Sequence, residues 1–165
     1  MIKWGDNMHY DYQKTSISLY RAVFKSNFST DVSCYLSPDA DLANASEVAP
    51  ILHPTFEQVA TGAHKRPPDI LPNKNTGEYD PDTGGTSVFD KPGALKRADF
   101  DFFIPAGTHI PPNLKVQKND YNDRIGATHY TIMPEKPLFK QALMGELDNF
   151  VRNAIKRQWE AARGL

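Results

Sequence analysis

Clustered prolines constrain this chain more than any other feature of its sequence. Its 165 residues include 13 prolines, which is about 8% where about 5% is usual. One cluster lies within residues 67–81 and another within residues 105–112. Because a proline inside a helix removes a backbone hydrogen bond and clashes with the preceding turn, no long helix can cross either cluster. The sequence therefore predicts short strands and ordered loops for the middle of the chain.

Five segments have the composition or the alternation that is typical of β-strands. Within the first of them, odd-numbered positions share one face of the strand and even-numbered positions share the other. The predicted strands are residues 16–24, 86–89, 100–104, 113–118 and 127–133.

Two segments predict helices. In residues 138–162, apolar side chains recur three or four positions apart, at 143, 147, 150, 151, 154, 155 and 159, and Gly164 is a suitable stop. Earlier in the chain, Ser37 is a candidate cap for a short helix with Pro38 at its first position. Between the short helix and the strands, residues 62–85 are polar, have no periodicity and predict a long loop, which in a compact domain is usually functional or disordered.

Charge and cysteine content exclude several classes of protein. Nineteen Lys and Arg residues against 20 Asp and Glu residues give a net charge of −1, which makes a nucleic acid or an acidic lipid surface an unexpected partner. The single cysteine, Cys34, cannot form an internal disulfide, and no Cys and His spacing predicts a metal site. No apolar run reaches the roughly 20 residues of a membrane helix, and the first residues lack the apolar core of a cleaved export signal.

Arg21 is the most informative single residue of the predicted strands. It lies between Leu19 and Val23 on a strand face that is otherwise apolar. Because an unpaired buried charge is costly, its guanidinium must either pair with an acidic side chain or meet an anion such as a phosphate. The strand alone leaves both alternatives open.

The segment Gly84-Gly85-Thr86-Ser87 is the second candidate site element. Glycines let the backbone approach a ligand closely or take a positive φ, and two hydroxyls after them suit a ligand that is oriented by hydrogen bonds. The segment is neither a nucleotide-hydrolase phosphate loop nor a dinucleotide-binding Gly-x-Gly-x-x-Gly, and an ordinary turn into a strand is the alternative. His129 and Tyr130 point to opposite faces of their strand, where a histidine is more often a structural group than a catalyst. Arg66 lies in the polar loop, where a solvated role is the alternative to ligand binding.

Several longer segments resemble one known family. They are residues 19–24, 82–90, 110–112, 127–134 and 148–155. In this order they are similar to the second exported toxin family of the type VI secretion system, over nearly all of the chain from about residue 10 onward. The resemblance implies one toxin domain spanning residues 1–165, of which residues 1–9 would be a loose N-terminal extension.

The resemblance also implies a fold and a site. The fold would be α+β and similar to the mono-ADP-ribosyltransferases, with split, bent β-sheets, flanking helices and a long C-terminal helix. Thr86 and Ser87 match the family's active-site pair, and Arg66 is the nearest match to an arginine of its NAD pocket. The other expected NAD contacts are Arg21, Gly85 and Tyr130. We expect Arg21 and the hydroxyls of Thr86 and Ser87 to line the same cleft.

One part of the wider fold's pattern is missing, because the chain has no Glu-x-Glu. Gln117, Glu135 and Glu146 are the candidates for the missing carboxylate's place, and Gln117 can hydrogen-bond a ribose hydroxyl. Three functions stay open: an NAD-dependent ADP-ribosyltransferase, an NAD glycohydrolase, or a growth-arresting binding protein without catalysis.

The resemblance further implies where the protein acts and what it meets. It would leave the producing cell's cytoplasm without a signal peptide, on the type VI carrier machinery, and act in the cytoplasm of a target bacterium. A small, helical, acidic immunity protein would neutralise it in the producing cell.

Overall fold

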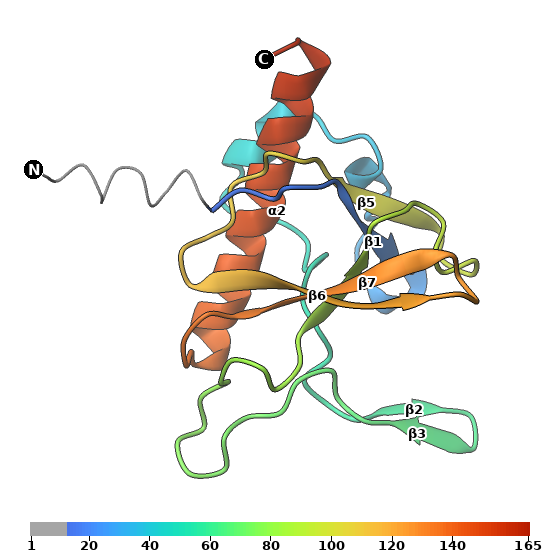
Figure 1. Ribbon diagram of the computed structural model, residues 1–165, viewed down its shortest axis with the longest axis vertical. Coiled ribbons are helices and arrows are strands. Elements are labelled where there is room, and N and C mark those ends of the chain that lie inside the picture. The colour runs from blue at the N-terminus through green and yellow to red at the C-terminus, as the bar shows by residue number, and fades with distance from the viewer. Residues whose placement is uncertain (1–12) are drawn as a thin grey trace, which may run out of the picture.

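The computed structural model describes residues 13–165, and the expectation of a loose extension at residues 1–9 lies outside them. The fold is α+β (Figure 1), with a five-stranded antiparallel sheet, a separate two-stranded hairpin and one long helix near the C-terminus. The sheet has the order β5-β1-β4-β7-β6. Its strands are β1 (Leu19–Val23), β4 (Thr86–Phe89), β5 (Phe100–Ile104), β6 (Leu114–Asn122) and β7 (Ala127–Pro134). The short 3-10 helices are η1 (Lys25–Asn27), η2 (Ser33–Tyr35) and η3 (Ala40–Asn44).

All five predicted strands are confirmed, together with the α+β class. Their ends agree within one residue except in β1, which begins only at Leu19, and in β6, which runs on to Asn122 through an irregular register between Lys118 and Tyr121. The sequence pattern ends at residue 118 because the following residues are polar and exposed.

The predicted C-terminal helix is α2 (Lys140–Ala162). Its buried residues are Leu143, Leu147, Phe150, Val151, Ala154 and Ile155, which is the predicted stripe except for Trp159. Trp159 is 38% exposed, and its ring lies against the Arg163 guanidinium. Gly164 ends the helix as predicted: its φ is +74°, and its N–H donates to the Ala161 carbonyl. Among the described residues, no helix is long and apolar enough to cross a membrane.

The predicted helix start at Ser37 and Pro38 is wrong. The segment forms only η3, which follows Asp39, and no side chain caps its backbone. A stretch this short gains few helical hydrogen bonds for the cost of nucleation. Its side chain Leu42 packs instead against the main core.

The polar loop contains structure that the sequence did not reveal. β2 (Val59–Thr61) and β3 (His64–Arg66) form a hairpin that extends from the body in Figure 1, with Gly62 at φ +62° in its turn. The rest of the segment is anchored by isolated bridges from Ile70 to Gly84 and from Tyr79 to Leu138. Three-residue strands are too short to show alternation in a sequence, which is why the hairpin was missed.

The two faces of the large sheet differ in character. Directly paired residues of antiparallel strands share a face, so the register of the strands assigns each side chain to one side of the sheet. The core face belongs to one buried apolar cluster with α2 and carries Leu19, Val23, Val88, Phe102, Ile104 and Ile132. The outer face carries Tyr20, Ser87, Phe89, Phe103, His129 and Thr131. The candidate site depends on this division.

Candidate functional site

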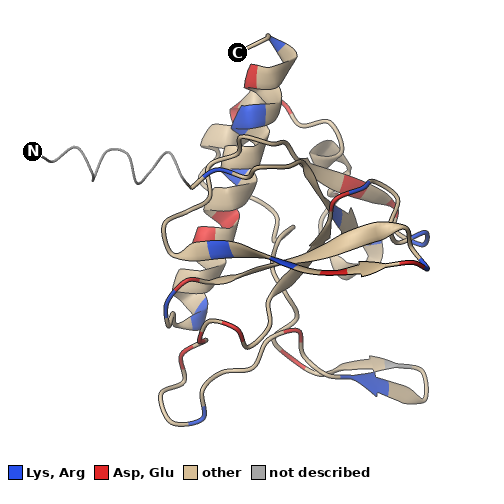
Figure 2. Cartoon of the chain, viewed as in Figure 1, with Lys and Arg blue, Asp and Glu red and all other residues tan. Residues whose placement is uncertain are grey.

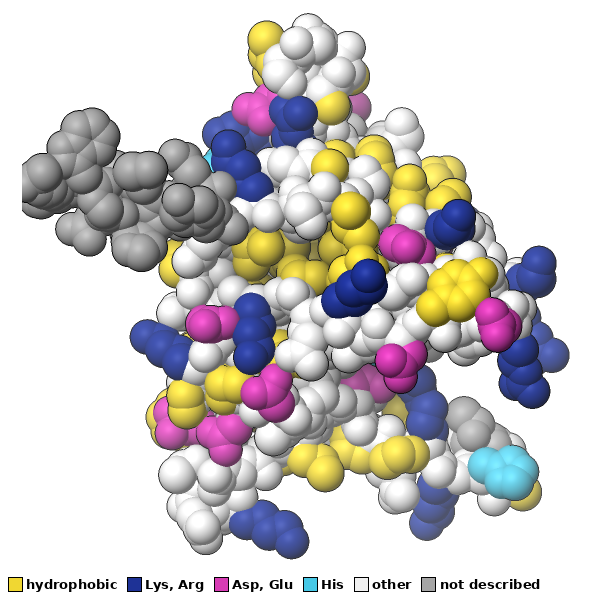
Figure 3. All heavy atoms as spheres, in the orientation of Figure 1, with side chains coloured by type: hydrophobic (Ala, Val, Ile, Leu, Met, Phe, Trp, Pro, Cys, Tyr) yellow, Lys and Arg dark blue, Asp and Glu magenta, His cyan; other side chains and the backbone are white. Residues whose placement is uncertain are grey.

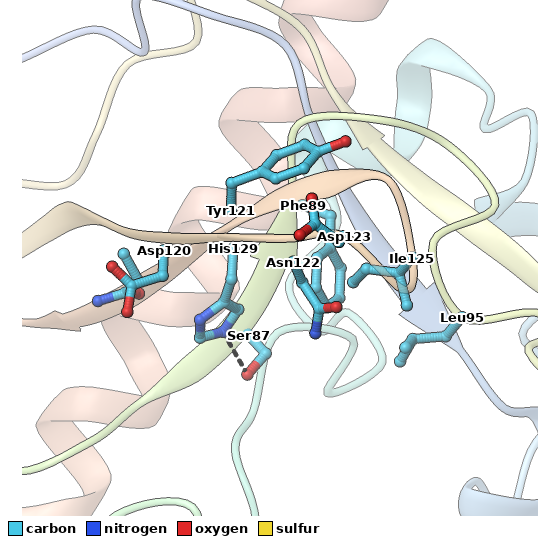
Figure 4. Close-up of a pocket in the computed structure, with 10 residues that line it drawn as sticks. Ser87, Phe89, Leu95, Asp120, Tyr121, Asn122, Asp123, Ile125 and His129 are labelled. Carbon is cyan, nitrogen blue, oxygen red and sulfur yellow. Dashed lines mark hydrogen bonds between the residues drawn. The ribbon is translucent and has the colours of Figure 1, made fainter.

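A groove of about 550 Å³ lies on the outer face of the sheet (Figure 4). Strands β4 and β7 contribute Ser87 and His129, and the β6–β7 hairpin contributes a polar rim. The lining residues are Ser87, Phe89, Leu95, Asn119, Asp120, Tyr121, Asn122, Asp123, Ile125 and His129. Within residues 13–165, no group of three or more His, Cys, Asp or Glu side chains gathers to hold a metal ion.

Ser87 and His129 form a hydrogen-bonded pair in this groove. The Ser87 Oγ lies 2.9 Å from the His129 Nε2, as the dashed line in Figure 4 shows. Burial lowers the pKa of His129 below its ordinary value of 6.5, so the imidazole is neutral at neutral pH. If Nε2 accepts the Ser87 proton, the hydroxyl offers lone pairs to a ligand; if Nε2 donates, the hydroxyl proton is offered instead. In both tautomers His129 orients the Ser87 hydroxyl.

The strand register produces this pair. Ser87 is paired with Thr131 and Phe89 with His129, so Ser87 and His129 are diagonal neighbours on one face. The ring of the buried Phe89 packs beside the imidazole, with the two ring centroids 5.5 Å apart.

An irregularity in β6 shapes the rim beside the pair. Lys118 is paired with Tyr130 and Tyr121 with Thr128, so two residues, Asn119 and Asp120, stand opposite the single residue His129. This is a β-bulge, which redirects side chains where it occurs. Both residues line the groove, and Thr131 donates its hydroxyl proton to the Asn119 Oδ1 at 2.6 Å.

Arg21 lies on the opposite face of the sheet from Ser87. Its guanidinium donates to the backbone carbonyls of Ile51 at 3.2 Å, Ser87 at 3.0 Å and His53 at 3.2 Å. Burial lowers its pKa to about 10, while the charge of Asp69 raises it and that of Arg66 lowers it. The predicted alternative of a paired acidic side chain is wrong in the described part of the chain, because the three partners that meet this cation are carbonyl dipoles.

Thr86 belongs to the same arrangement as Arg21. It is only 1% exposed, and its hydroxyl donates to the Leu52 carbonyl. The side chains of Arg21 and Thr86 therefore hold three consecutive backbone carbonyls, those of residues 51–53. We call residues 51–53 the strap. The imidazole of His53 ties the strap to α2, with its Nε2 2.8 Å from the Asp148 Oδ1.

The double glycine packs against backbone. A Cβ built on Gly84 would lie 2.1 Å from the Asp69 carbonyl oxygen, and one on Gly85 would lie 2.1 Å from the Ile132 carbonyl oxygen. Gly84 also has a φ of +118°, which only glycine adopts readily. The positive φ that the sequence left open is present at Gly84, and both glycines allow close packing between chain segments, which the sequence analysis did not predict.

The remaining predicted residues are spread over both faces and the hairpin. Gln117 is paired with Thr131, so it shares the outer face with Ser87, but it is exposed and outside the groove lining. Tyr130 is paired with Val88 on the core face, where it packs against the main cluster. Arg66 is exposed on β3.

The expectation of one cleft walled by Arg21 and both hydroxyls is therefore wrong. Ser87 lines the outer groove, whereas Arg21 and Thr86 hold the strap on the core side. Conversely, the strand position of His129 favoured a structural role, and no sequence pattern pointed to Asn119 or Tyr121. The only sequence signal for the rim was the polar stretch at residues 119–123, after the predicted strand. The β-bulge within it cannot be seen without the pairing of β6 with β7.

The comparisons with known proteins agree with one another. The family model described as Tse2 ADP-ribosyltransferase toxin matches residues 17–159. A curated relative from Pseudomonas aeruginosa, named Toxin Tse2, is 64% identical over 159 residues, which cover 96% of this chain and 100% of the relative.

Proposed function

Because the chain belongs to the family of Tse2 ADP-ribosyltransferase toxins, we propose that it is an antibacterial type VI effector that transfers ADP-ribose from NAD to an acceptor in the target cell's cytoplasm. The large sheet and the β2–β3 hairpin are the parts that we assign to the split, bent sheets of the ADP-ribosyltransferase fold. The observation that carries the proposal is the Ser87–His129 pair, because it presents one residue of the expected active-site element to a groove.

The groove suits the ribose and nicotinamide end of NAD. Its volume lies within the usual range of about 300–1,000 Å³ for small-molecule sites, and it combines a hydroxyl, an imidazole and an amide with the rings of Phe89 and Tyr121. NAD supplies a ribose–nicotinamide bond: an acceptor nucleophile bonds to the ribose carbon as nicotinamide leaves with the bonding electrons, and the nucleophile's proton passes to water. Ser87, oriented by His129, would hydrogen-bond a ribose hydroxyl, and Gln117 on the same face would provide a second polar contact.

The diphosphate of NAD needs a different surface. The carboxylates of Asp120 and Asp123 disfavour an anion in the groove itself. Below the β6–β7 hairpin the surface is hollowed (Figure 3), and the β2–β3 hairpin lies on the far side of this hollow. Strand β3 carries basic residues (Figure 2), and Lys65 and Arg66 are both exposed. We assign the phosphate contact to Arg66, since a guanidinium binds phosphate through two parallel hydrogen bonds.

The other predicted cofactor residues receive supporting roles in this proposal. Three of the five N–H donors of Arg21 are engaged by carbonyls, so it holds the strap and contributes long-range positive charge. Thr86 holds the strap, while Gly85 and Tyr130 support the backbone and the core side of the sheet.

Purified protein incubated with NAD labelled in its adenosine part and with a bacterial lysate tests the proposal. Transfer predicts release of nicotinamide and label on a macromolecule, both reduced in Ser87→Ala. Free labelled ADP-ribose without a labelled acceptor would identify an NAD glycohydrolase. If a preparation arrests growth but consumes no NAD, the protein would instead act as a binding protein without catalysis.

We also propose the partner that such a toxin requires. A cell that makes it must neutralise it before export by the type VI carrier machinery, and the expected neutraliser is a small, helical, acidic immunity protein. Expression in a sensitive bacterium should arrest growth unless the neighbouring gene is expressed too, and the two products should copurify. Healthy growth with the toxin alone would contradict this.

A further inference from the structure

The rim of the groove carries negative charge without compensation in its lining. Among the groove's lining residues, Asp120 and Asp123 are the carboxylates, no Lys or Arg is present, and His129 is neutral at neutral pH. Neither carboxylate takes part in an ion pair within residues 13–165. We call residues 120–123, the end of β6 and the start of its turn, the acidic lip.

The acidic lip also carries an exposed aromatic ring. Tyr121 is 58% exposed although it lines the groove, and Leu95 and Ile125 form an apolar wall across from the polar rim. A planar cation can lie over such a ring and meet carboxylates at its edge, whereas a compact ammonium makes less use of the ring.

The position of the acidic lip relates it to the reacting end of the site. The β-bulge places Asp120 opposite His129, and His129 is hydrogen-bonded to Ser87. A side chain bound by the lip would therefore lie in the same groove as the hydroxyl that we assign to the ribose. Four basic residues lie close to the lining residues in the chain: Lys96 and Arg97 follow Leu95 on the opposite wall, and Lys118 and Arg124 flank the lip itself. All four are exposed and outside the groove lining.

We propose that the acidic lip docks the acceptor by an arginine side chain, so that the acceptor is a protein with an exposed arginine rather than a nucleic acid. Charge complementarity carries the choice: two unpaired carboxylates attract a guanidinium and repel a phosphate backbone. The assignment rests on the proposed function, because only a transferase needs an acceptor.

Amide-resolved NMR titration of the full chain tests the docking directly. The probe is N-acetyl-arginine amide, and its neutral isostere N-acetyl-citrulline amide is the matched control ligand. The arginine probe should shift the amides of residues 119–125 and 129 and bind more tightly than the citrulline probe. Since exposed charge pairs are worth about 1.4-fold to fivefold each in affinity, Asp120→Asn with Asp123→Asn should weaken arginine binding about twofold to 25-fold.

A matched variant distinguishes the effect of the lip carboxylates from a general effect of the protein's net charge. Asp41→Asn with Glu47→Gln removes two exposed carboxylates that lie outside the groove lining and should leave the binding unchanged. Three results would each overturn the inference. The first is an equal loss of arginine affinity in both double variants, and the second is equal affinity for the arginine and citrulline probes. The third is that 1-methylnicotinamide shifts the lip amides but the arginine probe does not.

The two proposals fail in different ways. If NAD is consumed and an acceptor labelled while the lip ignores the arginine probe, the transferase stands and the docking is wrong. If the lip binds the probe but NAD is never consumed, the proposed function fails and the groove remains a cation-binding site.

Discussion

Replacement of Arg21 by alanine distinguishes a residue that holds the fold from one that grips a ligand. The change removes the donors to the carbonyls of Ile51, His53 and Ser87. A buried acceptor left without a partner costs about 1 to 3 kcal/mol, which gives about 3 to 9 kcal/mol for three. Two effects offset part of this sum: water can enter the vacated space, and the cost of burying the guanidinium, visible in its lowered pKa, disappears. We therefore expect a loss of about 3 kcal/mol, near the lower limit.

Urea unfolding of Arg21→Ala and of the wild type measures this loss. For a chain of this length, about 3 kcal/mol corresponds to a melting temperature lower by about 6 to 12 °C. Arg21→Lys should be destabilised too, because one ammonium cannot reproduce the forked geometry. If Arg21→Ala lowers the free energy of unfolding by less than about 1 kcal/mol but abolishes NAD consumption, the reasoning is refuted, and Arg21 binds the ligand instead.

Substitutions at three further positions and one pH profile test the remaining assignments. Thr86→Val should lower the free energy of unfolding by about 1 to 3 kcal/mol and Thr86→Ser by less, and equal losses in chemical unfolding would exclude the hydroxyl's role. Ser87→Ala should slow NAD consumption about tenfold to 100-fold at nearly unchanged stability; a folded, fully toxic variant would contradict its role. Gly85→Ala should melt earlier, because its Cβ would meet the Ile132 carbonyl oxygen at 2.1 Å, and an unchanged melting curve would argue against this packing. The lowered pKa of His129 means that the unfolded chain takes up a proton near pH 6.5 before the folded chain does. Its contribution to stability is therefore constant above that pH and falls as the pH drops below it, and an NMR titration showing a raised pKa would reverse the sign.

The sequence contained enough information for the elements but not for their pairing. Alternation in residues 16–24 and helical spacing in residues 138–162 reflect which side chains meet the core, and this is a property of each segment alone. The β2–β3 hairpin escaped because its strands are too short for any period. The helix expected at Ser37 failed because its capping signal was local, and the segment is too short to gain the hydrogen bonds that offset helix nucleation, so it forms only η3.

The site shows the same limit more sharply. Alternation places Thr86 and Ser87 on opposite sides of their own strand, but it cannot say which of them shares a side with Arg21. That depends on the pairing of Tyr20 with Phe89, which relates two strands separated by the polar loop. A shift of one residue in this register would exchange the two hydroxyls between the faces. The strap carbonyls were equally hidden, because any residue type presents the same backbone group.

The neighbouring residues Thr86 and Ser87 of β4 consequently have different roles, although they share one strand. Thr86 holds the Leu52 carbonyl on the core side, and the Ser87 carbonyl accepts from Arg21 while its side chain faces the groove. Any loosening of the strap on one face therefore shifts the strand that presents Ser87 on the other. Loss of activity in a Thr86 variant would not by itself place Thr86 against NAD. The distinguishing observation is its coupling to stability: Thr86 and Arg21 variants should lose both activity and folding free energy, whereas Ser87 variants should lose activity alone.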